Sequence, residues 1–175
     1  MTIIESYAPL DKIARDEKKG LLLENERRIL SFDLDMLQAS VERLTKISGE
    51  RVTEVLLVQI GNEIGKASFD HYKDEVKSDN DAGIVFDRVM RLRGWGRCLN
   101  LERQDRDDGK TVYVFNTADC PSCCDQKATK PRCNLMRGIV SGWLEGYLGR
   151  KSSEVIETAC AGIRGQLCVY ELTID

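Results

Sequence analysis

Apolar residues recur at spacings of three and four along several stretches of the chain, which is the pattern of helices that bury one face. The first stretch ends at Gly49, a residue typical of a helix C-terminus. Thr53 is expected to cap the N-terminus of the second. The predicted helices are residues 33–48, 53–73, 84–92 and 134–150.

Residues 98–102 and 111–116 are predicted as strands, the second because it is rich in β-branched and aromatic residues, and they form a hairpin with its turn at 107–110. Residues 153–158 and 167–174 are also expected as strands, joined by a tight reversal that contains two glycines. Residues 21–31 fit a strand pair or an irregular entry. Because helices and hairpins come in blocks, we expect an α+β fold with an antiparallel sheet packed against the helices.

The domain organisation is expected to be simple. Residues 1–20 mix apolar and charged positions without a clear period, which fits a short helix, a dimer arm or a mobile tail. Residues 21–175 are expected to form one domain, a size that a single hydrophobic core can support.

Glycines lie four residues apart on both long helices: Gly61 and Gly65 on one, and Gly138, Gly142 and Gly146 on the other. Each glycine inside a helix costs about 0.8–1 kcal/mol relative to alanine, so the pattern needs a compensating gain. One interpretation is close packing of another element against the glycine stripe. The other is a cavity for an apolar guest beside Trp143 and Tyr147.

Charge and hydropathy narrow the classes of function. The 175 residues include 26 basic and 29 acidic side chains, a net charge of −3, which disfavours a protein that grips a nucleic-acid backbone. No apolar run approaches the ~20 residues of a membrane span. The first residues lack the basic flank and long apolar stretch of a secretory signal, so a cytoplasmic location is expected.

In that reducing compartment, the seven cysteines are more typical of metal binding or chemistry than of disulfides. Cys98 stands apart and is expected in the core. Cys133, Glu157, Cys160 and Cys168 offer three thiolates and a carboxylate, the ligand number of a closed zinc site. Glu157 and Cys160 would face opposite sides of a regular strand, so the prediction requires an irregular backbone there.

Three further cysteines, Cys120, Cys123 and Cys124, precede this set and leave three interpretations open. They lie in a surface loop with no role or one that shields the site, or they form a redox pair, since C-x-x-C spacing lowers a thiol pKa. Alternatively they join Cys133 and the later cysteines in holding an iron–sulfur cluster, which uses four thiolates.

Three motifs resemble the 4-vinyl reductase domain family, which is also the sensor module of bacterial regulators activated by phenols and xylenes. They are Ser-Gly-Trp-Leu-Glu-Gly-Tyr-Leu-Gly at 141–149, Glu-Thr-Ala-Cys at 157–160 and Gly-Gln-Leu-Cys at 165–168. The resemblance covers about residues 20–175. It implies that zinc is held by Cys133, Glu157, Cys160 and Cys168. Cys123 or Cys124 is an alternative to Cys133 as the first of these ligands.

The resemblance also implies a fold shared with vesicle-tethering subunits that enclose an acyl chain, a homodimer, and a pocket for a small apolar ligand near the zinc. The family's phenol-contacting residues have no clear match in this chain. The expected pocket residues combine the glycine-notched helix with nearby aromatic side chains: Trp95, Tyr113, Phe115, Gly138, Gly142, Trp143, Gly146 and Tyr147.

The first functional interpretation is therefore a zinc-containing domain that senses or carries a small apolar, aromatic or acyl molecule without catalysing a reaction. An alternative is a reductase, or its accessory subunit, acting on a tetrapyrrole-like substrate with an iron–sulfur cluster or an external electron donor. No nicotinamide site is predicted, because Gly94-Trp95-Gly96 lacks the third glycine of the dinucleotide fingerprint. A third interpretation is an assembly module.

Overall fold

The computed structural model describes residues 13–16, 19, 21–24, 27–29, 33–123, 128–165 and 167–174. Contacts between residues divide the chain into two compact units, 1–40 and 41–175. The division falls inside helix α1 (Leu34–Ser48), which matches the helix predicted for this stretch.

The first unit contains a three-stranded antiparallel sheet of β1 (Ile13–Asp16), β2 (Leu21–Glu24) and β3 (Arg27–Ile29). Strands β2 and β3 confirm a strand pair in residues 21–31. Strand β1 was not predicted, because its four residues are too few to establish a period. It pairs with β2, so the expected boundary after residue 20 falls within this sheet.

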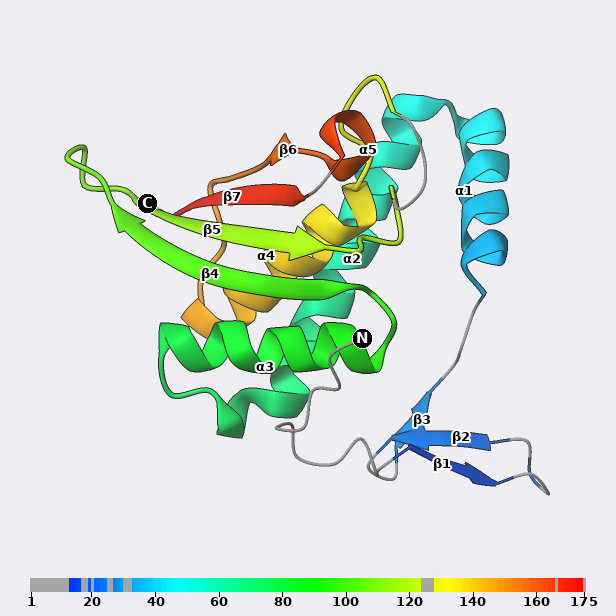
Figure 1. Cartoon of the computed structure of the whole chain (residues 1–175), viewed down its shortest axis with the longest axis horizontal. Coiled ribbons are helices and arrows are strands. Elements are labelled where there is room, and N and C mark those ends of the chain that lie inside the picture. The colour runs from blue at the N-terminus through cyan, green and yellow to red at the C-terminus, as the bar shows by residue number, and fades with distance from the viewer. Residues whose placement is uncertain are drawn as a thin grey trace. The chain divides into compact units, whose positions relative to one another are not determined.

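The second unit is built on a four-stranded antiparallel sheet in the order β4-β5-β7-β6 (Figure 1). Its strands are β4 (Arg97–Asp105), β5 (Thr111–Ala118), β6 (Glu154–Ala159) and β7 (Cys168–Ile174). Strands β4 and β5 form the predicted hairpin, and β6 and β7 are the two predicted C-terminal strands. The α+β class with an antiparallel sheet packed on helices is therefore confirmed.

The two central strands of this sheet, β5 and β7, carry its buried residues. Along β7 the residues alternate strictly, with Cys168, Tyr170, Leu172 and Ile174 buried and the residues between them half-buried. Phe115 of β5 lies opposite Tyr170 in the ladder. This buried face therefore carries both aromatic side chains and the first residue of β7, a cysteine.

The helices of the second unit are α2 (Glu50–Tyr72), the single turn η1 (Lys73–Glu75), α3 (Asp79–Leu92), α4 (Asn134–Leu148) and the short α5 (Ala161–Arg164). Helix α4 contacts β6 and β7 and packs along α2, while α3 packs against β4 and contacts α4. In Figure 1, α4 lies behind the sheet. The core between these elements includes Trp143, Phe86 and Phe115, all fully buried.

Two predicted helix starts were wrong. Helix α2 begins three residues before Thr53, after Gly49 with φ +81°, and the Thr53 hydroxyl instead donates to the Gly49 carbonyl at 2.9 Å. Helix α3 begins at Asp79, where Ser78 caps it by accepting a hydrogen bond from the Asp81 amide at 3.2 Å. The acidic first turn of α3 has the composition of a loop, which explains the error.

The glycines of α2 and α4 face each other, as the close-packing interpretation expected. A Cβ atom on Gly65 would overlap the Ile139 carbonyl oxygen, and one on Gly142 would overlap the Asn62 carbonyl oxygen. The same holds between Gly61 and the carbonyl of Leu135. The two backbones therefore touch, and the helix–helix contact supplies the gain that compensates for the low helix propensity of glycine.

None of the helices that the structure describes is long and apolar enough to span a membrane.

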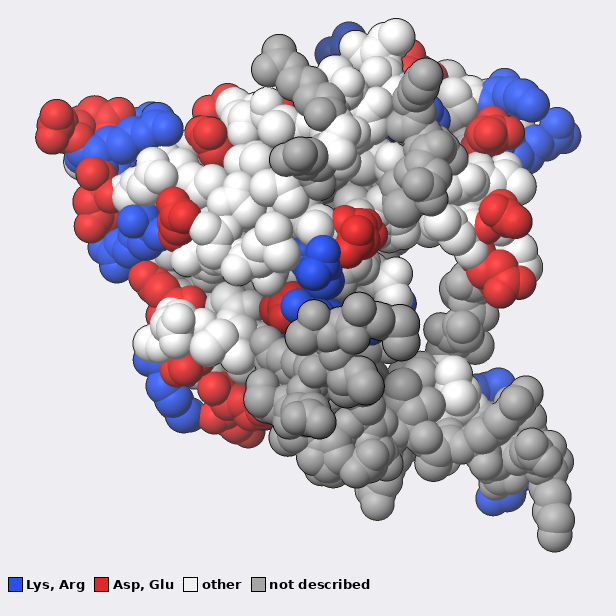
Figure 2. All heavy atoms as spheres, in the orientation of Figure 1, with Lys and Arg blue, Asp and Glu red and all other residues white. Residues whose placement is uncertain are grey.

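On the face drawn in Figure 2, basic and acidic side chains are interspersed around the β4–β5 hairpin. Several form ion pairs, such as that of Arg103 with Asp105 at 3.1 Å. The charges of this hairpin thus compensate one another.

Candidate metal centre

Four predicted ligands come together at one end of the buried sheet face. Cys133 directly precedes α4, Glu157 lies near the end of β6, Cys160 directly precedes α5, and Cys168 begins β7. All four side chains are buried, and their ligand atoms lie within 4.8 Å of one another. These residues are called the first ligand set.

The irregular backbone that this set requires is present. The β6–β7 register shifts between Glu157 and Ala159, so the pairing passes from Glu157–Tyr170 to Ala159–Val169. A bulge of this kind re-aims the side chains that follow it. Cys160 therefore reaches the same side as Glu157, although it lies three positions further along the chain.

The sulfur–sulfur distances fit one tetrahedral ion. The Cys133 Sγ lies 3.7 Å from that of Cys168 and 3.9 Å from that of Cys160. Zinc–sulfur bonds of about 2.3 Å in a tetrahedron place two sulfurs about 3.8 Å apart. The two measured sulfur–sulfur distances match this spacing.

Glu157 carries an unsatisfied polar atom. Its Oε2 accepts a hydrogen bond from the Cys133 amide at 3.0 Å, while its Oε1 is buried and has no hydrogen-bond partner. Such an atom costs about 1–3 kcal/mol unless something binds it. Burial also raises the pKa of this carboxyl group, because it disfavours the charged form. A cation among the four ligands would remove both penalties.

A cation would also favour the charged form of the thiols. Burial raises the pKa of the Cys160 thiol to about 12, although backbone amides of Gly162 and Arg132 partly oppose this. The Ala161 amide lies 3.4 Å from the Cys168 Sγ and donates to it. Because metal ligation requires thiolates, binding would release protons and become stronger as pH rises.

Two further cysteines adjoin this set. Cys120 and Cys123 lie in the connection between β5 and α4, and both are buried. The Cys120 Sγ is 3.5 Å from that of Cys133, and the Cys123 Sγ is 3.3 Å from that of Cys168. Cys120, Cys123, Cys133 and Cys168 form a second ligand set, also within 4.8 Å. Cys124 lies outside the described residues.

Tyr170 was missed as a residue of this region. Its ring is fully buried opposite both Phe115 and Glu157, and its hydroxyl lies 3.9 Å from the Cys120 Sγ. The alternation along β7 could have identified it, since Tyr170 follows Cys168 by two residues and so shares its face. Tyr170 thus joins the cysteine cluster to the aromatic core.

The aromatic residues expected around a pocket lie in or beside this core. Trp143 packs edge-on against Phe69 with ring centroids 5.4 Å apart, and its indole nitrogen donates to the Ala82 carbonyl at 3.1 Å. Tyr113 and Phe115 are buried, while Trp95 and Tyr147 are partly buried against the core. Gly138 and Gly142 contact the backbone of α2, and Gly146 faces the ring of Phe69.

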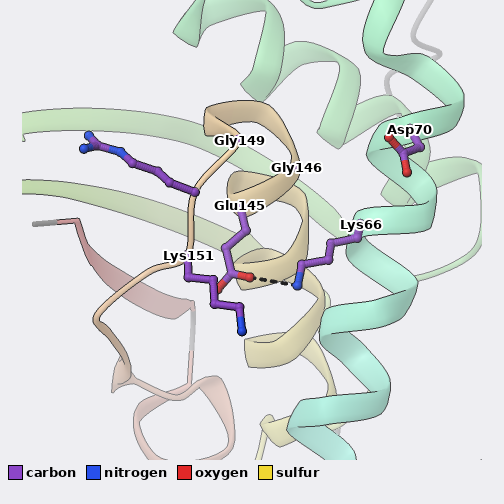
Figure 3. Close-up of a pocket in the computed structure, with 7 residues that line it drawn as sticks. Lys66, Asp70, Glu145, Gly146, Gly149 and Lys151 are labelled. Atoms are coloured by element: carbon purple, nitrogen blue, oxygen red, sulfur yellow. Dashed lines mark ion pairs between the residues drawn. The ribbon is translucent and has the colours of Figure 1, made fainter.

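A separate cleft of about 280 Å³ lies where α2 passes the C-terminal end of α4. Figure 3 shows its central ion pair, Lys66 with Glu145, at 3.1 Å. Of the expected pocket residues, it includes Gly146. Its lining is mostly charged: Lys66, Asp70, Glu145, Gly146, Gly149, Arg150 and Lys151.

Replacing Glu145 by glutamine should reduce stability by about 1–3 kcal/mol at pH 7. The carboxylate accepts from Lys66, from Asn62 at 3.3 Å and from the Ser152 amide at 3.2 Å. Burial raises the pKa of Glu145, but these donors outweigh it and lower the pKa overall. Glutamine would turn an amide group toward these donors.

The pH dependence of that variant follows from the direction of the shift. A folded-state pKa below the unfolded value, about 4.3, means that the carboxylate stabilises the fold above that pH. This contribution disappears as pH falls through the lower folded value. Urea unfolding of both proteins should therefore give a difference that shrinks below about pH 4; a constant difference would contradict the assignment.

Comparisons with known proteins agree with this fold. No protein-family model matches the chain, and no curated protein matches it by sequence. The crystal structure of the phenol-responsive sensory domain of the transcription activator PoxR, with phenol, aligns with a TM-score of 0.76. That alignment has 17% sequence identity and covers 92% of this chain and 84% of the other.

A vinyl-4-reductase family protein from Methanocaldococcus jannaschii aligns with a TM-score of 0.53. Its sequence is 19% identical, and the alignment covers 86% of each chain. The resemblance that the sequence motifs indicate is thus confirmed at the level of the fold. At these identities the likeness concerns the fold alone.

Proposed function

We propose that this chain is a zinc-binding domain that senses or carries a small apolar or aromatic molecule. The observation that carries the proposal is the first ligand set, in which three buried thiols and an unpartnered carboxylate oxygen converge. The fold supports it further, because the PoxR sensory domain that shares this fold is described with phenol.

Zinc is the ion that these ligands suit best. Soft thiolates select zinc or iron–sulfur clusters over magnesium or calcium. A four-iron cluster binds each thiolate to a different iron, and a two-iron cluster binds two thiolates to each iron, so in neither does one thiolate lie close to two others, as the Cys133 sulfur does here. Sulfur distances of 3.7 and 3.9 Å therefore favour a mononuclear tetrahedral ion. Four protein ligands leave no position for a reactive water, so the zinc would be structural.

The ligand site that we propose is the aromatic core beside the metal. The ring of Phe86 contacts the rings of both Trp143 and Phe115, with centroid distances of 5.2 and 5.5 Å respectively. Tyr170 connects this cluster to the cysteines. Because the rings fill the space between them, a guest molecule would have to repack them. Tyr113 and Tyr147 complete the proposed lining.

The experiment uses Trp143 as a reporter. The Trp95→Phe variant leaves Trp143 as the sole tryptophan of the two in the chain. Titration with phenol, o-xylene and palmitate should shift its emission saturably for at least one compound, and should raise Tm. Stabilisation reaches about 2.7 kcal/mol at a hundredfold excess over Kd.

The matched control is Trp143→Phe, which keeps the partly exposed Trp95. The fluorescence emission of Trp95 in this variant should stay unchanged as the compounds are added. If none of the three compounds changes Trp143 emission or Tm at saturating concentration, the ligand proposal is wrong. A zinc content that stays intact in that experiment would leave the metal assignment standing.

A homodimer formed through α2 is a further part of the proposal. Four apolar side chains along this helix are exposed by 40–56%: Val52, Val55, Leu56 and Ile60. Their spacing places them on one helix face, which is typical of an interaction surface. Native mass spectrometry tests the homodimer, because it gives the number of subunits.

A cytoplasmic location is also part of the proposal. The cysteines described in the structure are free thiols, which is consistent with a reducing compartment.

A further inference from the structure

We infer that this cluster holds two divalent metal ions, with the thiolates of Cys133 and Cys168 bridging them. The first ion is the zinc of the proposed function, on which this inference rests. The second ion would complete its coordination with Cys120 and Cys123. The connection between β5 and α4 is then a ligand-bearing segment in its own right.

The geometry of the six ligands carries the inference. They divide into two groups of four, and the two groups share Cys133 and Cys168. Those two sulfurs are 3.7 Å apart, close to the ~3.8 Å edge of a zinc–sulfur tetrahedron. Two tetrahedra that share this edge use every ligand once, apart from the two bridging sulfurs. No ligand of the six is then left without a metal.

The connection before α4 is built to present its two cysteines inward. Asp119, which precedes Cys120, has φ +57°, a conformation that non-glycine residues adopt rarely. The Cys123 amide then donates to the Cys120 carbonyl at 3.2 Å, closing a turn. Both side chains are 2% exposed or less. The C-x-x-C spacing is that of a chelating pair in structural zinc sites.

Charge explains why a second ion belongs there. One divalent ion with three thiolates and a carboxylate has a net charge of minus two. Two divalent ions with five thiolates and a carboxylate have the same net charge, so the second ion neutralises the two added thiolates. Without it, Cys120 and Cys123 would have to stay protonated beside bound thiolates, since further uncompensated buried charge is costly.

The first test counts metal ions by native mass spectrometry of the full chain. We expect two zinc ions per chain in the wild-type protein and one in the Cys120→Ser/Cys123→Ser double variant. Serine keeps a hydrogen-bond donor at each position. If these thiols only donate to bound thiolates, the variant would hold as many ions as the wild type, which would overturn the inference. Cys98→Ser, at a buried cysteine outside the cluster, should retain two.

A second measurement needs no variant. Co²⁺ added stepwise to denatured, metal-free protein as it refolds should raise the EPR signal during the first equivalent and lower it during the second, because bridging thiolates couple the two spins. A signal that rises through both equivalents, or that stops at one, would overturn the shared-ligand arrangement. Saturation at one ion leaves the proposed zinc site intact, whereas no binding at all defeats both.

Discussion

The Cys168→Ser variant should accumulate as insoluble or metal-free protein. Cys168 is completely buried and belongs to both ligand sets, so its loss removes a ligand from each of them. Structural zinc contributes about 10–16 kcal/mol in small zinc-binding peptides. That is as large as the whole free energy of unfolding of a typical domain, about 5–15 kcal/mol. Soluble yield, metal content and Tm are the measurements.

Cys98→Ser is the matched control, because Cys98 is also a buried free thiol but lies in β4 outside the ligand sets. Its Sγ donates to the Asn100 carbonyl at 3.4 Å, a role that a hydroxyl can take over. We expect a soluble protein with wild-type metal content. A Cys168→Ser protein that behaves like this control would show that Cys168 holds no metal.

The Gly142→Ala substitution should destabilise the protein by about 3 kcal/mol or more. The added Cβ would overlap the Asn62 carbonyl, and backbone cannot move aside as a side-chain tip can. The two helices would have to separate along their whole contact. Alanine's better helix propensity, worth about 1 kcal/mol, offsets only part of this. Thermal unfolding should show a Tm lower by roughly 6–12 °C.

Gly83→Ala supplies the comparison in another helix. Its Cβ would meet the Cβ of Leu101 at 3.1 Å, a tight contact with a side chain and not an overlap with backbone. The gain in propensity and the tight contact should nearly cancel, leaving Tm within a few degrees of wild type. Equal effects of the two substitutions would mean that the α2–α4 contact is not as close as described.

The sequence was most informative where a period ran for several turns or where chemistry was concentrated. The apolar period of α4 and the β-branched and aromatic residues of β5 and β7 sufficed to predict these elements. Three cysteines and one glutamate indicated a ligand set by their number and residue types, since four donors close a zinc site and soft thiolates select zinc. Their convergence rests on the bulge after Glu157, which was required but could not be derived.

Other features depended on long-range contacts that no local pattern encodes. Whether the glycine stripe packed against a helix or bordered a cavity was decided by α2, some 80 residues away in sequence. The inward orientation of Cys120 and Cys123 depends on the turn after Asp119 and on β7. Tyr170 gained significance only through its neighbours across the sheet.

X-ray absorption at the zinc edge, on protein purified without added metal or chelator, tests the central claim most directly. The proposed zinc site predicts that most atoms bound to zinc are sulfurs at about 2.3 Å, with a smaller contribution from oxygen at about 2.0–2.2 Å. A shell of nitrogen and oxygen alone, or protein that folds normally with no metal to measure, would contradict it.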